Sequence, residues 1–416
     1  MRLSIFSLCM VTGLTLLLSS CKKESDSINN LTTDQSKESA TDQIKANTKK
    51  LYVCNVNQLY DAINNPASEG CTLVLAPGTY KLDPDHPNGG RLDLLRNMSL
   101  IGQEGDPKSV VIDVSALPLK SVTLEEGFRT GVVRTGNGNN AIEWMTLRND
   151  GKNEDIRSLI QTDIAATPIA RVRIAHTIVQ GATIGINIAN RLETSNGRTI
   201  EAAIENNEIR NNTLPPFGVG ILIQSQLADN GTIKTIMKGN YIHGNLHGII
   251  GINSSCLNHK INIVSYNDRM EENGVGVAFM GGYADDDAYP AKNNSILFSA
   301  FSTDIRNNTK TSQPLLVPIP GGVYAAAGEL EGDATKGVAD NNRVEALFTN
   351  CRIEGNTGTA QINAFGAYST VAGTPAGSHN VCAVYLKGIS KNTAVNAVPS
   401  SPVEPAKTNK VFVYRQ

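Results

Sequence analysis

Two histidines stand four residues apart in the stretch GNYIHGNLHGIIGI, at His243 and His247. On a helix this spacing would bring both rings to one face, where they could bind a zinc ion. They could also be a catalytic base with its partner, or two unrelated members of a repeat. The choice depends on the secondary structure that carries them.

The stretch is one copy of a repeat with an apolar anchor residue in each copy. The anchors are Leu147, Ile178, Ile209, Ile242, Met270, Ile305 and Ile353, at spacings of 31, 31, 33, 28, 35 and 48 residues. Self-similarity at such a period indicates a solenoid, propeller or array. Short period-two runs with glycine punctuation, such as GVGILI, predict strands and not helices. The variable spacing favours a coil of short parallel strands, because extra residues can bulge out as loops.

Asparagine recurs three places after most anchors. This column reads Gly181, Asn212, Asn245, Asn273, Asn308 and Asn356. Asparagine accepts left-handed backbone conformations and can hydrogen-bond its turn or a stacked neighbour. We therefore predict an asparagine ladder at one bend of the coil. His243 and His247 would then lie on either side of that bend, so we do not expect them to bind one metal together, and His243 alone remains a candidate.

The residue directly after each anchor should point away from the core. This outward column reads Val179, Arg210, His243, Glu271, Arg306 and Glu354. Stacked long side chains could grip an anionic polymer. They could also form a solvated face of alternating salt bridges, and the mixed signs favour that second interpretation.

The N-terminal part carries a recognisable opening. A helix capped by Asn57, with Leu59, Tyr60, Ala62 and Ile63 on it, precedes CTLVLAPGTYKL and RLDLLRNMSLIGQEG. These segments resemble the start of the pectate-lyase-like, right-handed parallel β-helix superfamily. The resemblance covers residues 51 to 400. It implies an all-β, single-stranded right-handed parallel β-helix, a solenoid, whose first coil is covered by a short capping helix.

Enzymes of this superfamily act mostly on acidic polysaccharides, so the resemblance implies a polysaccharide partner. A lyase must remove the proton beside a uronate carboxylate, which needs a base and a group that neutralises the carboxylate, such as calcium or arginine. The candidate catalytic residues are Arg210, His243, Lys260, Arg269 and Arg306.

Calcium prefers hard oxygen ligands. The candidate ligands are Asp285, Asp286 and Asp287 in GGYADDDAYP. Three adjacent aspartates cannot easily converge on one ion from an extended strand, so a solvated loop is the alternative. The later loop GELEGDATKG, with Glu329, Glu331 and Asp333, is ambiguous in the same way.

Two functions remain open because the resemblance is specific to the superfamily and not to one enzyme family. The pattern of polygalacturonase-like members is incomplete, because His247-Gly248 lacks the preceding glycine, the aspartate cluster comes after it, and no Arg-x-Lys follows. The Trp-Ile-Asp-His and Arg-x-Pro-x-x-Arg of pectate lyases are missing too. One hypothesis is a surface protein that recognises an extracellular acidic polysaccharide and cleaves it by β-elimination, with glycoside hydrolysis less favoured. The other is a non-catalytic β-helix surface protein, an adhesin or scaffold.

Cysteine spacing suggests two pairs. Cys54 and Cys71 flank the expected helix and could close a small loop. Cys382 lies 31 residues after Cys351, so these two could stack on adjacent coils, close enough for a disulfide. Two buried thiols that merely pack remain an equal alternative.

The chain begins with a segment that we exclude from the fold. Arg2, the apolar run of residues 5 to 18 and the sequence Leu18-Ser19-Ser20-Cys21 resemble a lipoprotein signal peptide with its lipobox. We expect a signal peptide at 1–20, a flexible tether at 21–50, the β-helix at 51–400, and a tail or final strand at 401–416.

An acylated Cys21 would hold the protein on the bacterial cell envelope, at the outer membrane or cell surface, so the membrane is a partner through the lipid anchor only. With 18% charged residues, a net charge of -2 and a pI near 6.3, the 416-residue chain lacks the basic footprint of a nucleic-acid-binding protein. We expect a monomer.

Overall fold

The computed structural model describes residues 49–117, 131–150, 158–163, 167–309, 319–332, 338–358, 360–371, 373–374, 376–401 and 408–416. All described residues belong to one compact unit, Ala40–Gln416. The expected signal peptide, the lipidation site Cys21 and the tether up to residue 48 lie outside the described residues. Within the described part, no helix is long and apolar enough to cross a membrane.

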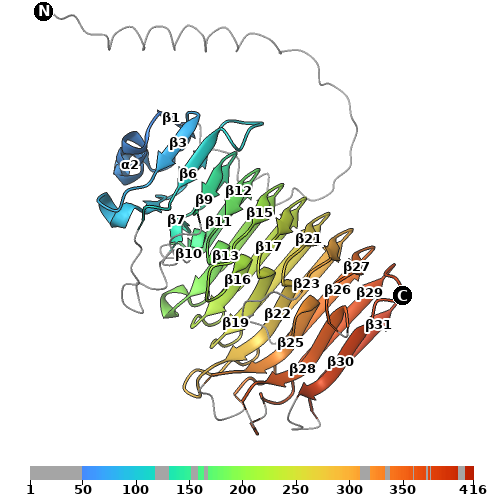
Figure 1. The fold of residues 1–416 in the computed structure, drawn as a ribbon. Coiled ribbons are helices and arrows are strands. Elements are labelled where there is room, and N and C mark those ends of the chain that lie inside the picture. Colours follow the sequence, from blue (N-terminus) through green and yellow to red (C-terminus); the bar gives the residue numbers. More distant parts are fainter. Residues whose placement is uncertain are drawn as a thin grey trace, which may run out of the picture. The chain divides into compact units, whose positions relative to one another are not determined.

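Three parallel sheets wind around a common core and make a right-handed parallel β-helix (Figure 1). Consecutive strands of one sheet come from consecutive coils of the chain, and every pair of neighbours is parallel, as in β11 with β14 and β16 with β19. The fold that the N-terminal resemblance implied is therefore confirmed.

We call the three sheets A, B and C. Sheet A contains β1 (Lys50–Val53), β2 (Thr72–Leu75), β5 (Ser99–Ile101), β8 (Asn139–Glu143), β11 (Ile169–Ala175), β14 (Thr199–Glu205), β17 (Thr232–Lys238), β20 (Lys260–Tyr266), β23 (Ser295–Phe301), β26 (Arg343–Thr349), β29 (Val381–Lys387) and β31 (Lys410–Arg415). Sheet B contains β3 (Gly78–Lys81), β6 (Val110–Asp113), β9 (Thr146–Arg148), β12 (Ile178–Gln180), β15 (Glu208–Arg210), β18 (Tyr241–His243), β21 (Arg269–Glu271), β24 (Asp304–Arg306) and β27 (Arg352–Glu354).

Sheet C contains β4 (Leu92–Asp93), β7 (Gly131–Thr135), β10 (Ser158–Asp163), β13 (Ile184–Arg191), β16 (Val219–Gln226), β19 (His247–Ser254), β22 (Val275–Ala284), β25 (Gly321–Leu330), β28 (Ile362–Ser369) and β30 (Val395–Ser401). The helical elements are α2 (Val56–Asn64) and the short 3-10 turns η2 (Pro66–Ser68), η3 (Pro87–Gly90) and η4 (Glu193–Ser195).

The anchors of the repeat stack in the core of sheet B, with one correction. Ile209, Ile242, Met270, Ile305 and Ile353 are mutual register partners on successive strands. In β12, however, the residue in register with Ile209 is Val179 and not Ile178. Val179 is fully buried, so its predicted outward position is wrong. Ile and Val are adjacent there, and hydrophobicity alone could not choose between them.

The predicted asparagine ladder is confirmed. The backbone N–H and side-chain Nδ2 of Asn212 both donate to Oδ1 of Asn245, at 3.0 Å each. The same pair of bonds links Asn245 to Asn273, Asn273 to Asn308, and Asn308 to Asn356. The left-handed backbone falls one residue earlier than expected, at Asn211, Gly244, Glu272, Asn307 and Gly355. The ladder residues therefore supply hydrogen bonds, and their predecessors make the turn.

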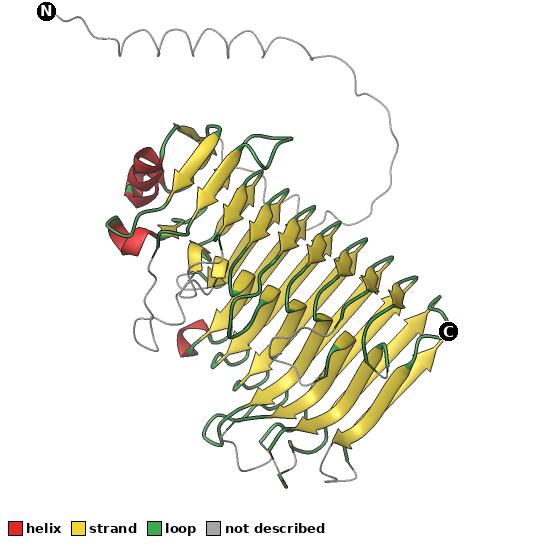
Figure 2. Cartoon of the chain, in the orientation of Figure 1, coloured by secondary structure: helices red, strands yellow, loops and turns green. Residues whose placement is uncertain are grey.

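Helix α2 lies at the N-terminal end of the coil (Figure 2). It buries Leu59, Tyr60 and Ile63 and contacts β1 and β4, as expected of a cap. Its N-cap is Asn55, whose Oδ1 accepts the backbone N–H of Gln58 at 3.0 Å, and not the predicted Asn57, which is already inside the helix.

The cysteines remain free thiols. Cys71, Cys351 and Cys382 are buried and Cys54 is exposed. The register partner of Cys382 on the preceding coil is Val344, whereas Cys351 lies at the bend before β27. The predicted stacking of Cys351 on Cys382 is therefore wrong, and none of the four forms a disulfide in the structure.

Candidate functional site

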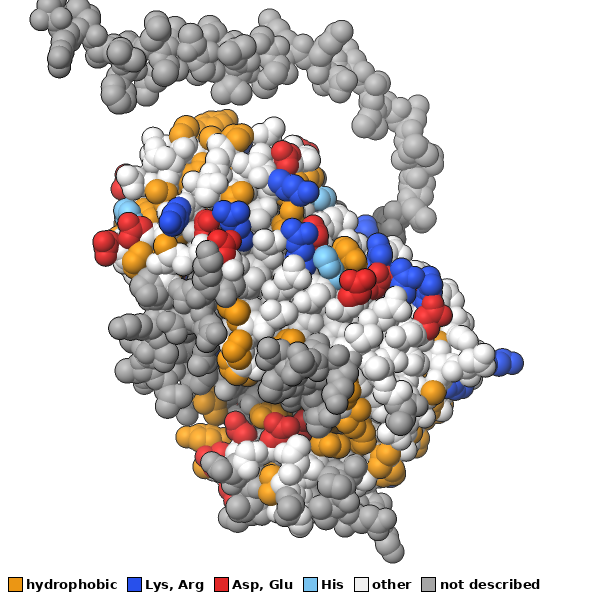
Figure 3. Space-filling model, viewed as in Figure 1, with side chains coloured by type: hydrophobic (Ala, Val, Ile, Leu, Met, Phe, Trp, Pro, Cys, Tyr) orange, Lys and Arg blue, Asp and Glu red, His pale blue; other side chains and the backbone are white. Residues whose placement is uncertain are grey.

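Four of the five basic candidates lie on the outer face of sheet B, in what we call the ion-pair row. Its members are Glu208, Arg210, His243, Arg269, Glu271, Asp304, Arg306, Arg352 and Glu354. Blue and red side chains alternate over these strands (Figure 3). This alternation agrees with the interpretation of the outward column as a solvated face of salt bridges.

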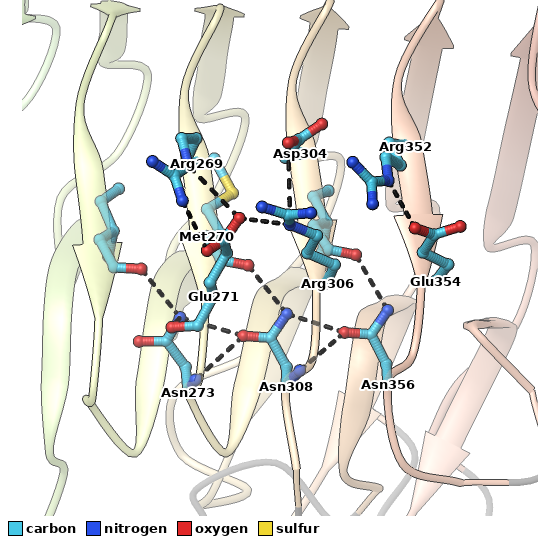
Figure 4. A network of polar contacts seen from close by, with 12 residues as sticks. Arg269, Met270, Glu271, Asn273, Asp304, Arg306, Asn308, Arg352, Glu354 and Asn356 are labelled. Carbon is cyan, nitrogen blue, oxygen red and sulfur yellow. Dashed lines mark hydrogen bonds and ion pairs between the residues drawn. The ribbon is translucent and has the colours of Figure 1, made fainter.

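The row is held together by short contacts. Arg210 donates to Oε1 of Glu208 at 2.7 Å, and His243 lies 3.3 Å from the same oxygen. Figure 4 shows Glu271 between Arg269, at 2.9 Å, and Arg306. Burial opposes ionisation of Glu271, but hydrogen bonds from Arg269 and Arg306 hold its pKa below its usual value. These arginines are engaged with carboxylates of their own sheet.

The fifth basic candidate, Lys260, is separate from the row. It is the first residue of β20 in sheet A and its side chain is exposed. The candidate bases therefore do not converge on one site.

The two histidines that drew attention in the sequence belong to different faces. His243 is on the outside of sheet B, where its ring stacks on Tyr241 at a centroid distance of 4.1 Å. His247 is the first residue of β19 in sheet C, is fully buried, and its Nδ1 lies 2.9 Å from the carbonyl oxygen of Phe217. Burial lowers the pKa of His247 to about 4. The two histidines thus lie on different sheets, His243 in sheet B and His247 in sheet C.

The three aspartates of the calcium prediction lie just after β22. Asp285 lies 3.5 Å from the hydroxyl of Ser255, and Oδ1 of Asp286 accepts the backbone N–H of Ala288 at 2.8 Å. Across the residues that the structure describes, no group of three or more His, Cys, Asp or Glu side chains could hold a metal ion. The calcium role of Asp285, Asp286 and Asp287 stays a prediction, and Asp333 lies outside the described residues.

A cleft of about 170 Å³ opens on the outer face of sheet C. It crosses strands β10, β13, β16, β19 and β22, and Phe217 and Leu222 supply apolar wall. Its polar lining consists of Ser158, Asn187, Arg191, Gln224, Gln226, Ser254, Tyr283 and Asp285. A concave site with apolar walls and a few convergent polar groups is the usual form of a ligand site.

The strand register explains why these side chains meet. Arg191, Gln226, Ser254 and Tyr283 are successive register partners on β13, β16, β19 and β22, so they form one row across the sheet. Neighbouring parallel strands are about 4.8 Å apart, so the row presents a polar group at each such step. The amides are pre-positioned, since Gln224 Nε2 donates to Oδ1 of Asn187 at 2.9 Å.

A cluster of tyrosines and glutamates adjoins the cleft at its β22 side, where Tyr283 is the member that lines it. We call Tyr283, Tyr324, Glu329, Glu331 and Tyr368 the tyrosine-glutamate wall. Tyr283 donates to Oε2 of Glu331, and Tyr324 donates to Oε2 of Glu329, each at 3.0 Å.

The wall carries titratable groups with perturbed acidity. Burial and the nearby Asp285 carboxylate raise the pKa of Glu331. Burial also raises the pKa of Tyr283, followed in effect by the charge of Glu331. The hydroxyl of Tyr283 therefore remains protonated at neutral pH.

Most residues of this cleft have no distinctive pattern in the sequence. Asp285 and Glu331 stand out as members of acidic loops, whereas Tyr283 and Arg191 do not. The usable signal was the period-two alternation of GINIANR and GVGILIQSQ, which turns Asn187, Arg191 and Gln224 outward.

Comparisons with known proteins reach the fold and no further. No protein-family model matches the chain, and no curated protein matches it. Solved structures that resemble it include ORF18 of Geobacillus virus E2, at 12% identity and a TM-score of 0.46, covering 87% of this chain and 58% of that one. The chain thus spans little more than half the length of the viral protein.

Two further similar structures are named as carbohydrate enzymes. They are the pectate lyase Pel9A, at 14% identity and a TM-score of 0.38 over 88% of this chain and 83% of that one, and the A-module of the Azotobacter vinelandii mannuronan C-5 epimerase AlgE4, at 12% and 0.32 over 88% and 99%. Likenesses at these identities and scores carry no argument about activity.

Proposed function

We propose that the protein binds an extracellular acidic polysaccharide in the cleft of sheet C and cleaves it by β-elimination. One observation carries the proposal: Arg191, Tyr283 and Asp285 line the same cleft. They are a cation, a protonated hydroxyl and a carboxylate, the three kinds of group that elimination from a uronate uses.

Each group has a defined task. Arg191 faces the uronate carboxylate, whose charge it offsets. Asp285 takes the proton from the carbon beside that carboxylate as a general base. The electron pair of that C–H bond forms a carbon–carbon double bond, the glycosidic C–O bond breaks, and Tyr283 gives its proton to the leaving oxygen. In the structure Tyr283 donates this proton to Oε2 of Glu331, so the hydroxyl turns from Glu331 to the leaving oxygen before the transfer.

A polymer suits this surface better than an isolated sugar. The polar row continues along the coil axis from strand to strand, and Phe217 and Leu222 give the cleft an apolar side for the sugar rings. We further propose that an acylated Cys21 and the residues up to 50 carry this surface on the bacterial envelope. Replacing Cys21→Ala should release the protein from the membrane fraction, and retention there would exclude that anchor.

Binding without cleavage is the second candidate. It is favoured by the engagement of Arg210, Arg269 and Arg306 with carboxylates of the ion-pair row. Under this alternative the β-helix is an adhesin or scaffold that uses the same cleft.

One assay separates these outcomes. The full chain is incubated with pectin, polygalacturonate, alginate and chondroitin, and the ultraviolet absorbance of unsaturated uronates is followed, with polymer binding measured in parallel. Tyr283→Phe keeps the ring but removes the proton, so elimination should fall about 10²- to 10⁴-fold with binding retained. Tyr266→Phe, on the outer face of sheet A, is the matched control and should not change the rate.

Binding with no absorbance across the panel would favour the non-catalytic candidate. If the protein shows no binding and no absorbance change with any polymer of the panel, the proposed function is excluded.

A further inference from the structure

Glu329 lies on the outer side of sheet C, yet its carboxyl group is buried. Its side chain has no exposed surface, and its register partners are Tyr283 on one side and Tyr368 on the other. Tyr324 donates to Oε2, while Oε1 has no hydrogen-bond partner among the described residues. A buried carboxyl with one unpartnered oxygen requires a physical explanation.

Among the residues that the structure describes, no cation is paired with this carboxyl. The titratable groups that face it are Tyr283 on β22, Tyr324 on β25, Glu331 directly after β25 and Tyr368 on β28. Apolar side chains pack around these groups. Phe365 and Met280 belong to the same buried cluster as Tyr324, and Leu330 belongs to a second buried cluster. Burying an ionised carboxylate without a partner costs several kcal/mol, so such a group keeps its proton instead.

The proton can be assigned to one oxygen. Because Oε2 accepts the hydroxyl of Tyr324, the acid proton of Glu329 belongs on Oε1. Burial, and next the charge of Glu331, raise the pKa of Glu329 well above its usual value, in agreement with this assignment.

We propose that Glu329 is a positioning residue of the cleft that acts as a neutral carboxylic acid, holding Tyr324 and with it the wall that carries Tyr283. This inference rests on the proposed function for its biological meaning. Loss of the Glu329 proton would place a negative charge in the apolar wall beside Glu331. The wall would loosen, and the cleft would lose its Tyr283 side in alkaline solution.

Hydrogen exchange tests this without any polymer. Amide protection is measured by mass spectrometry for β22, β25 and β28 in the full chain at increasing pH, after correction for intrinsic exchange. The wild-type wall should lose protection by up to about tenfold for each unit of pH between the ordinary carboxyl pKa, which Glu329 has in the opened wall, and its raised pKa in the closed wall. Glu329→Gln has no titrating group at this position, so its wall should lose less protection over the same range, with Glu331 as the remaining contribution.

Two further variants sharpen the result. Tyr324→Phe removes the hydrogen bond that favours the ionised form, so the loss of protection should continue to higher pH than in the wild type. Glu345→Gln, on the outer face of sheet A, is the matched control and should follow the wild type. The same pH dependence in Glu329→Gln and wild type would overturn the proposal, even if Glu329→Gln were less stable overall.

This outcome is distinguishable from failure of the proposed function. Absence of elimination and binding in the polymer assay leaves the exchange result unchanged. If polygalacturonate is cleaved, Glu329→Gln should also extend activity to higher pH, and an unchanged alkaline limb would contradict the positioning role.

Discussion

A second buried ladder of asparagines contains one aspartate, Asp268, in place of an asparagine. Asn207 donates to Oδ1 of Asn240, and Asn240 in turn donates to Oδ1 of Asp268 through its backbone N–H at 2.7 Å and its Nδ2 at 2.8 Å. Ser265 donates to the other oxygen at 2.7 Å. These bonds favour the ionised form, but burial outweighs them and raises the pKa of Asp268 to about 6.

The replacement Asp268→Asn should stabilise the protein at neutral pH. A folded pKa above the unfolded value means that the stabilisation from Asp268 is fully present below about pH 4 and is lost as the pH rises through about 6. Asparagine has no such loss, so the variant should gain about 2 kcal/mol over wild type at pH 7.5 and almost nothing at pH 4. Urea unfolding at both pH values measures this, and an equal difference at both would contradict it.

We interpret the ion-pair row of sheet B as stabilising the fold and not as binding the polymer. Substitutions of Arg210 and Arg306 test this role. Arg306 contacts Glu271, whose side chain is only 7% exposed, whereas the Glu208 partner of Arg210 is 30% exposed. Arg306→Ala should therefore cost about 1–2 kcal/mol of unfolding free energy, and Arg210→Ala no more than about 1 kcal/mol. Both should bind polymer like wild type.

The measurements are urea unfolding and a polymer pull-down on the same samples. Loss of binding in either variant at unchanged stability would instead make the row the polymer-binding surface.

At the level of strands, the sequence predicted the repeat better than the site. The asparagine column was visible because the ladder needs one residue type at one position, from Asn212 to Asn356. The outward positions of Asn187 and Gln224 follow from alternation of period two. Alternation does not tell which of three outer faces forms a cleft, however, because that depends on the loops. Tyr283 and Glu331 come together only through the register of β22 and β25.

Over the whole molecule, buried acids and buried bases act on stability in opposite directions. Burial lowers the pKa of His247 to about 4 and that of His259 to about 3, so each stabilises the fold above its unfolded pKa and loses that contribution as the pH falls. Asp268, Glu329 and Glu331 have raised pKa values, so they gain as the pH falls.

These opposing contributions predict a plateau in the unfolding free energy between about pH 6.5 and 4.5, followed by a steep loss below about pH 4. Below that point the buried carboxyls are protonated in both states and no longer compensate, while His259 still loses its contribution down to about pH 3. Glu201 and Glu271 are ion-paired and have lowered pKa values. Their protonation in this range breaks the ion pairs, so the stability that these pairs contribute is lost as well. Urea unfolding at a series of pH values gives the curve. Asp268→Asn removes one compensating acid, so its plateau should slope downward toward acid, and a wild-type curve that already falls steeply between pH 6.5 and 4.5 would show that the histidines dominate alone.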